Sequence, residues 1–224
     1  MTNNTGNTIE KRQFTHATFF PLLTVLLISL VFILEKGMDW DFHKAGIYPR
    51  KLEGIWGILT SPFIHADFKH LINNLVSFLV LGVTLYYFYA PIATRVLLIT
   101  CLLSGLILWV IGRESWHIGA SGVIYSLAFF LFFSGLIRKH IPLIAISLIV
   151  VFLYGNMIWY ILPLEANSEI SWEGHLSGAF TGSISAVVFR NKGPQKPQKI
   201  WDDEDDDNEE EDDEQHLKQN INET

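Results

Sequence analysis

The chain has 224 residues, half of them apolar, and a positive mean hydropathy of +0.28. Its formal net charge is −7, but 13 of the 23 acidic residues and only one of the 16 basic residues lie beyond residue 200, so residues 1–200 carry +5. This composition excludes an ordinary soluble domain, and the single cysteine, Cys101, excludes an internal disulfide framework.

The apolar residues gather in six blocks close to the ~20-residue length of a membrane-spanning helix. Lipid offers no hydrogen-bond partners to the backbone, so each block is predicted to be a helix. The last block is less apolar and rich in Gly, Ser and Ala, which is typical of a helix packed among others. The prediction is an all-α membrane protein with six transmembrane helices, at 17–35, 69–90, 92–112, 119–137, 141–162 and 173–190.

Basic residues flank these blocks on one side of the predicted membrane. They include Lys11 and Arg12 before the first block, Arg138 and Lys139 after the fourth, and Arg190 after the sixth. Because basic loops stay in the cytoplasm, both termini are predicted to be cytoplasmic. Six tryptophans fall at or beyond the opposite ends, as in an interfacial belt: Trp40, Trp56, Trp109, Trp116, Trp159 and Trp172.

Charge also divides the chain into three parts. A cytoplasmic N-terminal segment is expected over residues 1–14, a six-helix core over 15–190 and an acidic tail over 191–224. The run from Asp202 to Glu214 holds twelve acidic residues in 13 positions, so self-repulsion predicts a disordered, solvated tail. Binding of a metal or a basic partner by the tail is an open alternative.

Three polar side chains are predicted at the same depth. His70, Ser121 and His175 lie in the first turns of the second, fourth and sixth blocks, which enter the membrane from the same side. Each alone has an ordinary explanation as helix packing, an interhelical hydrogen bond or a satisfied buried histidine. Polar groups are costly in hydrocarbon, so the three together predict a functional site.

These residues suit acyl transfer by a serine nucleophile. Ser121 lies in Gly119-Ala120-Ser121-Gly122 and needs a neutral base, for which His175 is the candidate. Tyr125 is one turn deeper on the same helical face and is predicted to stack on His175. The nearest acid, Glu173, precedes His175 by two positions and points elsewhere, which favours a Ser–His dyad.

A second pair of side chains can serve the oxyanion. His70 and Asn74 are four residues apart on one helical face, and the backbone N–H of Ser121 lies at a helix N-terminus. Such donors stabilise developing negative charge in acyl transfer. Gly119 and Gly122 permit the close backbone approach that this arrangement requires.

The chain resembles the rhomboid family of intramembrane serine proteases. The matching motifs are His65-x4-His70-x3-Asn74, Gly119-x-Ser121-Gly122 with Tyr125, and His175-x2-Gly178-x3-Gly182. The resemblance implies a rhomboid-like six-helix bundle that cleaves membrane-anchored substrates in or near their transmembrane segments. It implies Ser121 as nucleophile, His175 as base, an oxyanion hole from His70 and Asn74, entry of substrate past the fifth helix, and a bacterial plasma membrane location.

The resemblance has one departure. Many relatives carry Trp-Arg in the loop between the first two spans, where this chain has Trp56-Gly57, which puts the polar bracing of that loop in doubt. The expected partners are transmembrane substrates and the lipid bilayer, without nucleic acid, metal or cofactor. The alternatives are a non-catalytic rhomboid-like protein that binds transmembrane clients, and a transporter, although no internal six-helix repeat is visible.

Overall fold

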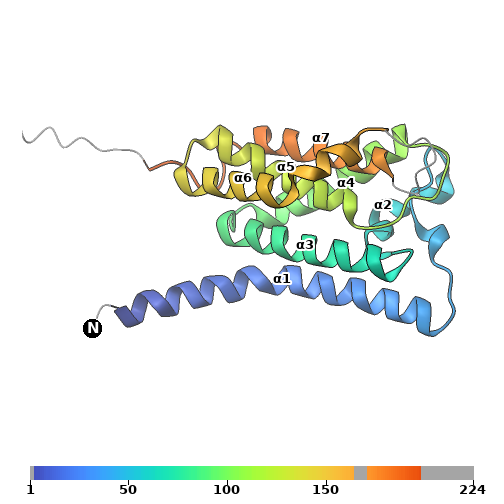
Figure 1. Ribbon diagram of the computed structural model, residues 1–224, viewed down its shortest axis with the longest axis horizontal. Helices are drawn as coiled ribbons and strands as arrows, with labels where there is room; N and C mark the ends of the chain where they lie inside the picture. Colours follow the sequence, from blue (N-terminus) through green and yellow to red (C-terminus); the bar gives the residue numbers. More distant parts are fainter. Residues whose placement is uncertain (1–2, 164–170, 198–224) are drawn as a thin grey trace, which may run out of the picture.

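The computed structural model describes residues 3–163 and 171–197, which form a helical bundle (Figure 1). The acidic run from Asp202 to Glu214 lies outside the described residues. The bundle helices are α1 (Asn3–Gly37), α3 (Phe68–Phe88), α4 (Ala93–Ile111), α5 (Ser121–Arg138), α6 (Ile141–Tyr154) and α7 (Trp172–Val188), with the short α2 (Gly57–Thr60) in the first loop and a 3-10 segment, η4 (Gly155–Ile161), after α6.

Five helices of the described chain are long and apolar enough to cross a membrane: α3, α4, α5, Glu10–Gly37 of α1, and Ile141–Ile161, where η4 continues α6. The protein is therefore a multi-pass integral membrane protein. The sixth predicted span corresponds to α7, which has 17 residues. At 1.5 Å per residue α7 measures about 26 Å, somewhat less than a hydrocarbon core of about 30 Å, so its crossing stays a prediction.

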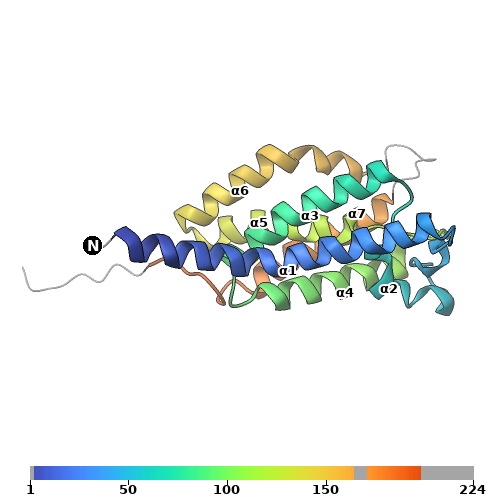
Figure 2. The same cartoon turned by 90° about the horizontal axis from the view of Figure 1, so that it is seen from below.

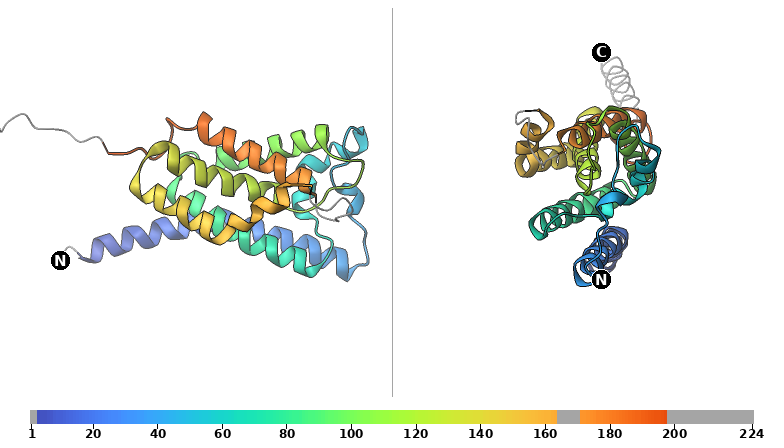
Figure 3. Two further views of the ribbon diagram at one scale, coloured as in Figure 1. Left: turned by 45° about the horizontal axis from the view of Figure 1, so that its top comes forward. Right: turned by 90° about the vertical axis from the view of Figure 1, so that its right-hand side faces the viewer.

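The first helix begins at Asn3 and not near residue 17. The prediction marked the apolar stretch, whereas polar residues can continue the same backbone hydrogen-bond ladder. α1 also passes through Pro21, whose ring lies against Gly82 of α3. α1 runs along α3 at the edge of the bundle, as the end-on view shows (Figure 3).

The centre of the bundle is α5, whose span is 61% buried, compared with 17–39% for the other four. It contacts α3, α4, α6 and α7, and α6 and α4 flank it on opposite sides (Figure 2). The burial of α5 explains why a helix in an apolar environment can carry polar residues: they face protein and not lipid.

Small residues bring α5 and α7 into close contact, as the spacing of Gly178 and Gly182 predicted. A Cβ atom at Gly178 would collide with the carbonyl of Gly122, and one at Gly182 with the carbonyl of Ser126. Ser126 Oγ donates to the Gly178 carbonyl at 3.0 Å across this interface. The two helices that carry Ser121 and His175 therefore have little freedom to slide.

An arginine fixes the same two helices at the end far from Ser121. Arg138, the last residue of α5, is buried, and its guanidinium donates to the carbonyls of Phe189, Lys192 and Pro194, each at 2.7 Å. A fourth bond, at 2.8 Å, reaches Ser134 Oγ. These carbonyls lie just beyond the C-terminus of α7, where a cation is favoured, so Arg138 ties that end to α5.

The loop between α1 and α3 lacks the arginine of many relatives and is braced in another way. A side chain at Gly57 would collide with the backbone of Gly46, so this position admits only glycine at the observed packing. Arg50 supplies the polar contact, because its guanidinium donates to the Gly112 carbonyl at 2.7 Å beyond the end of α4. A single antiparallel bridge between Ile47 and His117 adds a second attachment.

Candidate active site

Ser121 is the first residue of α5 and is half-buried. Its own N–H and those of Gly122 and Val123 have no helical acceptor four residues earlier, and they carry the positive end of the helix dipole. Gly119 enters this turn with φ at +105°, a conformation that favours glycine. The turn therefore presents a hydroxyl and unpaired amides together at one helix end.

His175, in the first turn of α7, is buried, and its ring lies against Tyr125 of α5. The ring centroids are 4.2 Å apart and the planes differ by 10°, which is the stacking that the sequence predicted. His175 Nδ1 lies 3.0 Å from the carbonyl oxygen of Tyr160 in η4. Because a carbonyl oxygen only accepts, Nδ1 carries the proton in this contact, and Nε2 of the neutral ring keeps its lone pair.

Ser121 and His175 lie in the first turns of α5 and α7, two helices that pack against each other. Ser121 lies one helical turn from Tyr125 on α5, and Tyr125 is the residue on which His175 stacks. Among the described residues, no hydrogen bond joins Ser121 Oγ to the His175 ring. Hydrogen bonds between catalytic groups are often long in structures without substrate, so the lack of this bond does not argue against the pair.

His70 and Asn74 meet at Gly119, just before Ser121. A Cβ at Gly119 would lie 2.7 Å from His70 Cε1 and Nε2 and 3.4 Å from Asn74 Nδ2. Glycine at this position therefore allows both α3 side chains to approach the backbone that leads into α5. The structure thus brings His70, Asn74 and the Ser121 turn together, as the oxyanion prediction requires.

His65 orients the Asn74 amide. Its ring is fully buried, and its Nε2 accepts a hydrogen bond from Asn74 Nδ2 at 2.9 Å. Burial, together with the nearby His70, lowers the pKa of His65 from 6.5 to about 4, although the Phe63 carbonyl and Asp67 oppose this shift. His65 is therefore neutral at physiological pH and available as an acceptor.

Asp67 is a residue that the sequence analysis missed. It caps α3 by accepting the backbone N–H of His70 at 2.8 Å, and this hydrogen bond lowers the pKa of the Asp67 carboxyl. An aspartate immediately before an apolar helix is a recognisable N-cap signal. Asp67 fixes where α3 begins and hence the position of His70 in its first turn.

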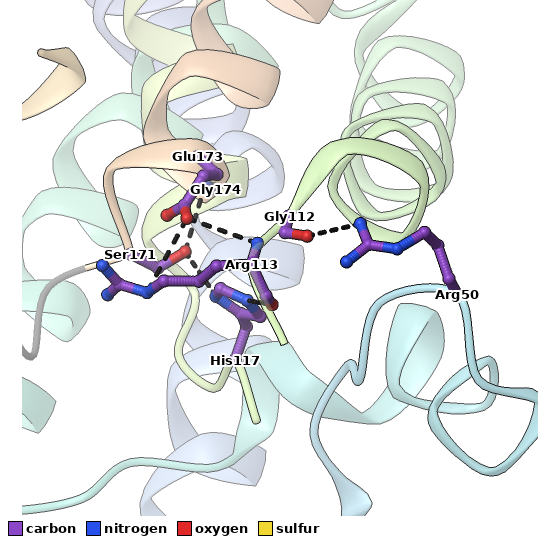
Figure 4. Close-up of polar contacts among 7 residues, drawn as sticks. All are labelled: Arg50, Gly112, Arg113, His117, Ser171, Glu173 and Gly174. Carbon is purple, nitrogen blue, oxygen red and sulfur yellow. Dashed lines mark hydrogen bonds and ion pairs between the residues drawn. The ribbon is translucent and has the colours of Figure 1, made fainter. Parts of the chain in front are cut away.

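The sequence analysis also missed a group of polar residues that links the loop before Ser121 to the start of α7. Arg113, His117, Ser171 and Glu173 form hydrogen bonds and an ion pair with one another (Figure 4). The prediction that Glu173 points away from His175 agrees with its contact to Arg113. The partners of Glu173 lie about 60 residues earlier in the chain, so their spacing gave no signal.

A cavity of about 30 Å³ lies beside Ser121, on the side of α4. Its wall is mostly apolar, but the lining residues include Ser61, Ser104, His117 and Ser171, together with Gly119. Its volume is enough for one or two water molecules, given that about 10–15 Å³ holds one. The Ser121 turn is thus next to a small space that is large enough for water and has a few polar side chains in its wall.

Comparisons with known proteins show the family to which this chain belongs. A model of the rhomboid domain matches residues 52–192, more than half of the chain. An uncharacterized protein of Mycobacterium tuberculosis is 35% identical over 175 residues, which cover 75% of this chain and 72% of that protein. Mouse rhomboid-related protein 2 is 28% identical over 209 residues, which cover 81% of this chain and 69% of that protein. This chain belongs to the rhomboid family.

Proposed function

We propose that the protein is an intramembrane serine protease in which Ser121 is the nucleophile and His175 the general base. The observation that carries the proposal is the His175 contact to the Tyr160 carbonyl, which leaves Nε2 as a proton acceptor. The carbonyl has the orienting role that an aspartate has in soluble triads. Tyr125 supports the ring from one face, so the base is held without a buried charge.

The reaction proceeds in two steps. Ser121 Oγ attacks the carbonyl carbon of the substrate, and its proton passes to His175 Nε2. The oxyanion takes hydrogen bonds from the Ser121 N–H and from the side chains of His70 and Asn74. When the tetrahedral intermediate collapses, the C–N bond breaks and the amine leaves with the proton from His175. Water, deprotonated by the same ring, then hydrolyses the acyl-enzyme.

The proposed substrates are membrane-anchored proteins cut in or near a transmembrane segment. The site lies at the N-terminal ends of α3, α5 and α7, next to the loop that contains α2 (Figure 1). The basic residues at the opposite end, including Lys11, Arg138 and Arg190, support cytoplasmic termini and a site that opens toward the other face. The presence of both Ser121 and an oriented His175 favours a protease over a non-catalytic client-binding protein.

The test uses the full chain purified in detergent with a fluorescent transmembrane substrate. Wild-type protein is expected to cleave, whereas Ser121→Ala and His175→Ala each abolish cleavage. A fluorophosphonate probe should label the wild type, fail on Ser121→Ala and react slowly with His175→Ala. Cleavage that persists in both alanine variants would contradict the assignment.

A further inference from the structure

The loop that precedes Ser121 is joined to the helix that carries His175 by two polar contacts. Residues 112–120 connect α4 to α5, and α7 begins at Trp172, three residues before His175. The first contact is the pair Arg113–Glu173: Arg113 Nε lies 3.7 Å from Glu173 Oε1, and the backbone N–H of Arg113 donates to the same oxygen at 3.3 Å. One carboxylate therefore holds both the side chain and the backbone of the loop (Figure 4).

The second contact is a chain of hydrogen bonds through His117, which is buried. His117 Nε2 lies 3.1 Å from the Arg113 carbonyl and must donate to it, so Nδ1 accepts from Ser171 Oγ at 2.7 Å. Ser171 Oγ in turn accepts the Gly174 N–H at 3.1 Å as the N-cap of α7. Burial lowers the pKa of His117, which favours the neutral ring that this chain of hydrogen bonds requires.

Burying the carboxylate of Glu173 costs free energy. Glu173 is only 2% exposed, and its Oε2 atom has no hydrogen-bond partner among the described residues. A buried ion pair is weak evidence of stabilisation, because apolar residues of similar size often serve as well. Breaking such a pair leaves a buried charge, which disfavours any arrangement that separates Glu173 from Arg113. Stability alone therefore does not explain a carboxylate in the first turn of α7.

We propose that Arg113, His117, Ser171 and Glu173 form a latch that sets the separation of Ser121 and His175. Within the described contacts, the latch residues bond to the loop and to the α7 N-terminus and not to Ser121 or His175. They are positioning residues, because they act through the elements on which the two reacting groups lie. The inference rests on the proposed function and adds to it the means by which the base is kept in register with the nucleophile.

The kinetic test removes the charge of each partner in turn. Glu173→Gln and Arg113→Gln are each expected to lower kcat at least about fivefold with little change in KM, because small displacements of reacting groups reduce rates steeply. The double variant should lose no more than either single one, since the two residues act as a unit. The matched control is Glu114→Gln, an exposed acid in the same loop that pairs with Arg50. Wild-type kcat in Glu173→Gln, or an equal loss in Glu114→Gln, would overturn the latch.

A distance measurement separates failure of the latch from failure of the proposed function. In a Cys101→Ser background, spin labels are attached to the cysteines of Ser115→Cys and Leu176→Cys. They report the distance between the loop and the first turns of α7. Glu173→Gln should broaden this distance distribution, while Glu114→Gln leaves it narrow. If the wild type neither cleaves nor reacts with fluorophosphonate, the proposed function is wrong, and an unchanged distribution in Glu173→Gln rejects the latch separately. Should Glu173→Gln not fold, Ser171→Ala, which removes only the second contact, must give the same broadening.

Discussion

The imidazole of His175 lies on the ring of Tyr125 with centroids 4.2 Å apart, while its Nδ1 faces the carbonyl of Tyr160 at 3.0 Å. One contact fixes the plane of the ring and the other fixes which nitrogen carries the proton. Tyr125 is itself tied to the same segment, because its hydroxyl donates to the Met157 carbonyl at 3.0 Å. The segment η4 thus holds both members of the stacked pair through backbone carbonyls.

Removing the Tyr125 ring should weaken catalysis more than removing its hydroxyl. Tyr125→Ala deletes a stacked contact worth about 0.5–1.5 kcal/mol, so kcat should fall by up to about tenfold. Tyr125→Phe keeps the ring and loses only the bond to Met157, for which a decrease of about threefold is expected. Initial rates on the fluorescent transmembrane substrate measure both. Equal losses in the two variants would mean that stacking is not what positions His175.

Acid should destabilise the protein through His65. Its folded-state pKa of about 4 lies below its ordinary value of 6.5, so the unfolded chain binds more protons between these values. Stability is therefore complete above pH 6.5 and decreases as the pH falls toward 4, by up to about 3 kcal/mol. Denaturant unfolding in micelles at pH 7, 5 and 4 measures this loss.

The matched substitution for that measurement is His65→Gln, which can still accept from Asn74 but does not titrate. It should show a shallower pH dependence than the wild type, while the exposed His43→Gln should behave like the wild type. If the unfolding free energy of His65→Gln falls with pH as steeply as that of the wild type, the acid sensitivity belongs to other groups. His117 is one such group, because burial also lowers its pKa.

The α5–α7 contact should not tolerate one added methyl group. Gly178→Ala places a Cβ against the Gly122 carbonyl, so the helices must separate at a cost of about 1–3 kcal/mol. Because Gly122 follows Ser121, the separation should also reduce activity. Gly37→Ala is the control, since a Cβ there meets no atom within 4 Å. Thermal unfolding and cleavage rates are measured for both variants. A Gly178→Ala protein as stable and active as Gly37→Ala would refute the close contact.

Restoring the arginine that many relatives carry after Trp56 should harm this protein. Any side chain at position 57 meets the backbone of Gly46, so Gly57→Arg and Gly57→Ala should both lower the unfolding temperature. Arg50→Gln, by contrast, removes the bonds to the end of α4 and the exposed ion pair with Glu114, and should cost about 1–3 kcal/mol. A Gly57→Arg variant that is more stable than the wild type would show that the loop can repack around the family's usual residue.

The sequence alone indicated the main helices and part of the candidate site, although not Asp67 or the residues around the loop before Ser121. Hydrophobic length located the spans, because lipid forces an apolar backbone into helices, and polar residues at membrane depth stood out against that background. Helical periodicity was enough to place Tyr125 on the same face as Ser121 and to relate Gly178 to Gly182. These inferences depend on neighbours three or four residues apart, which a helix brings together by itself.

Only the tertiary structure decided the contacts between distant segments. Nothing in the chain near His175 indicates that Tyr160 supplies its acceptor, nor that Glu173 pairs with Arg113 sixty residues earlier. The absence of an arginine after Trp56 likewise gave no hint that Arg50 braces the loop. Local spacing fixes which side chains share a helix face, whereas the choice of partner depends on how the packed helices place backbone carbonyls and charges from separate parts of the chain.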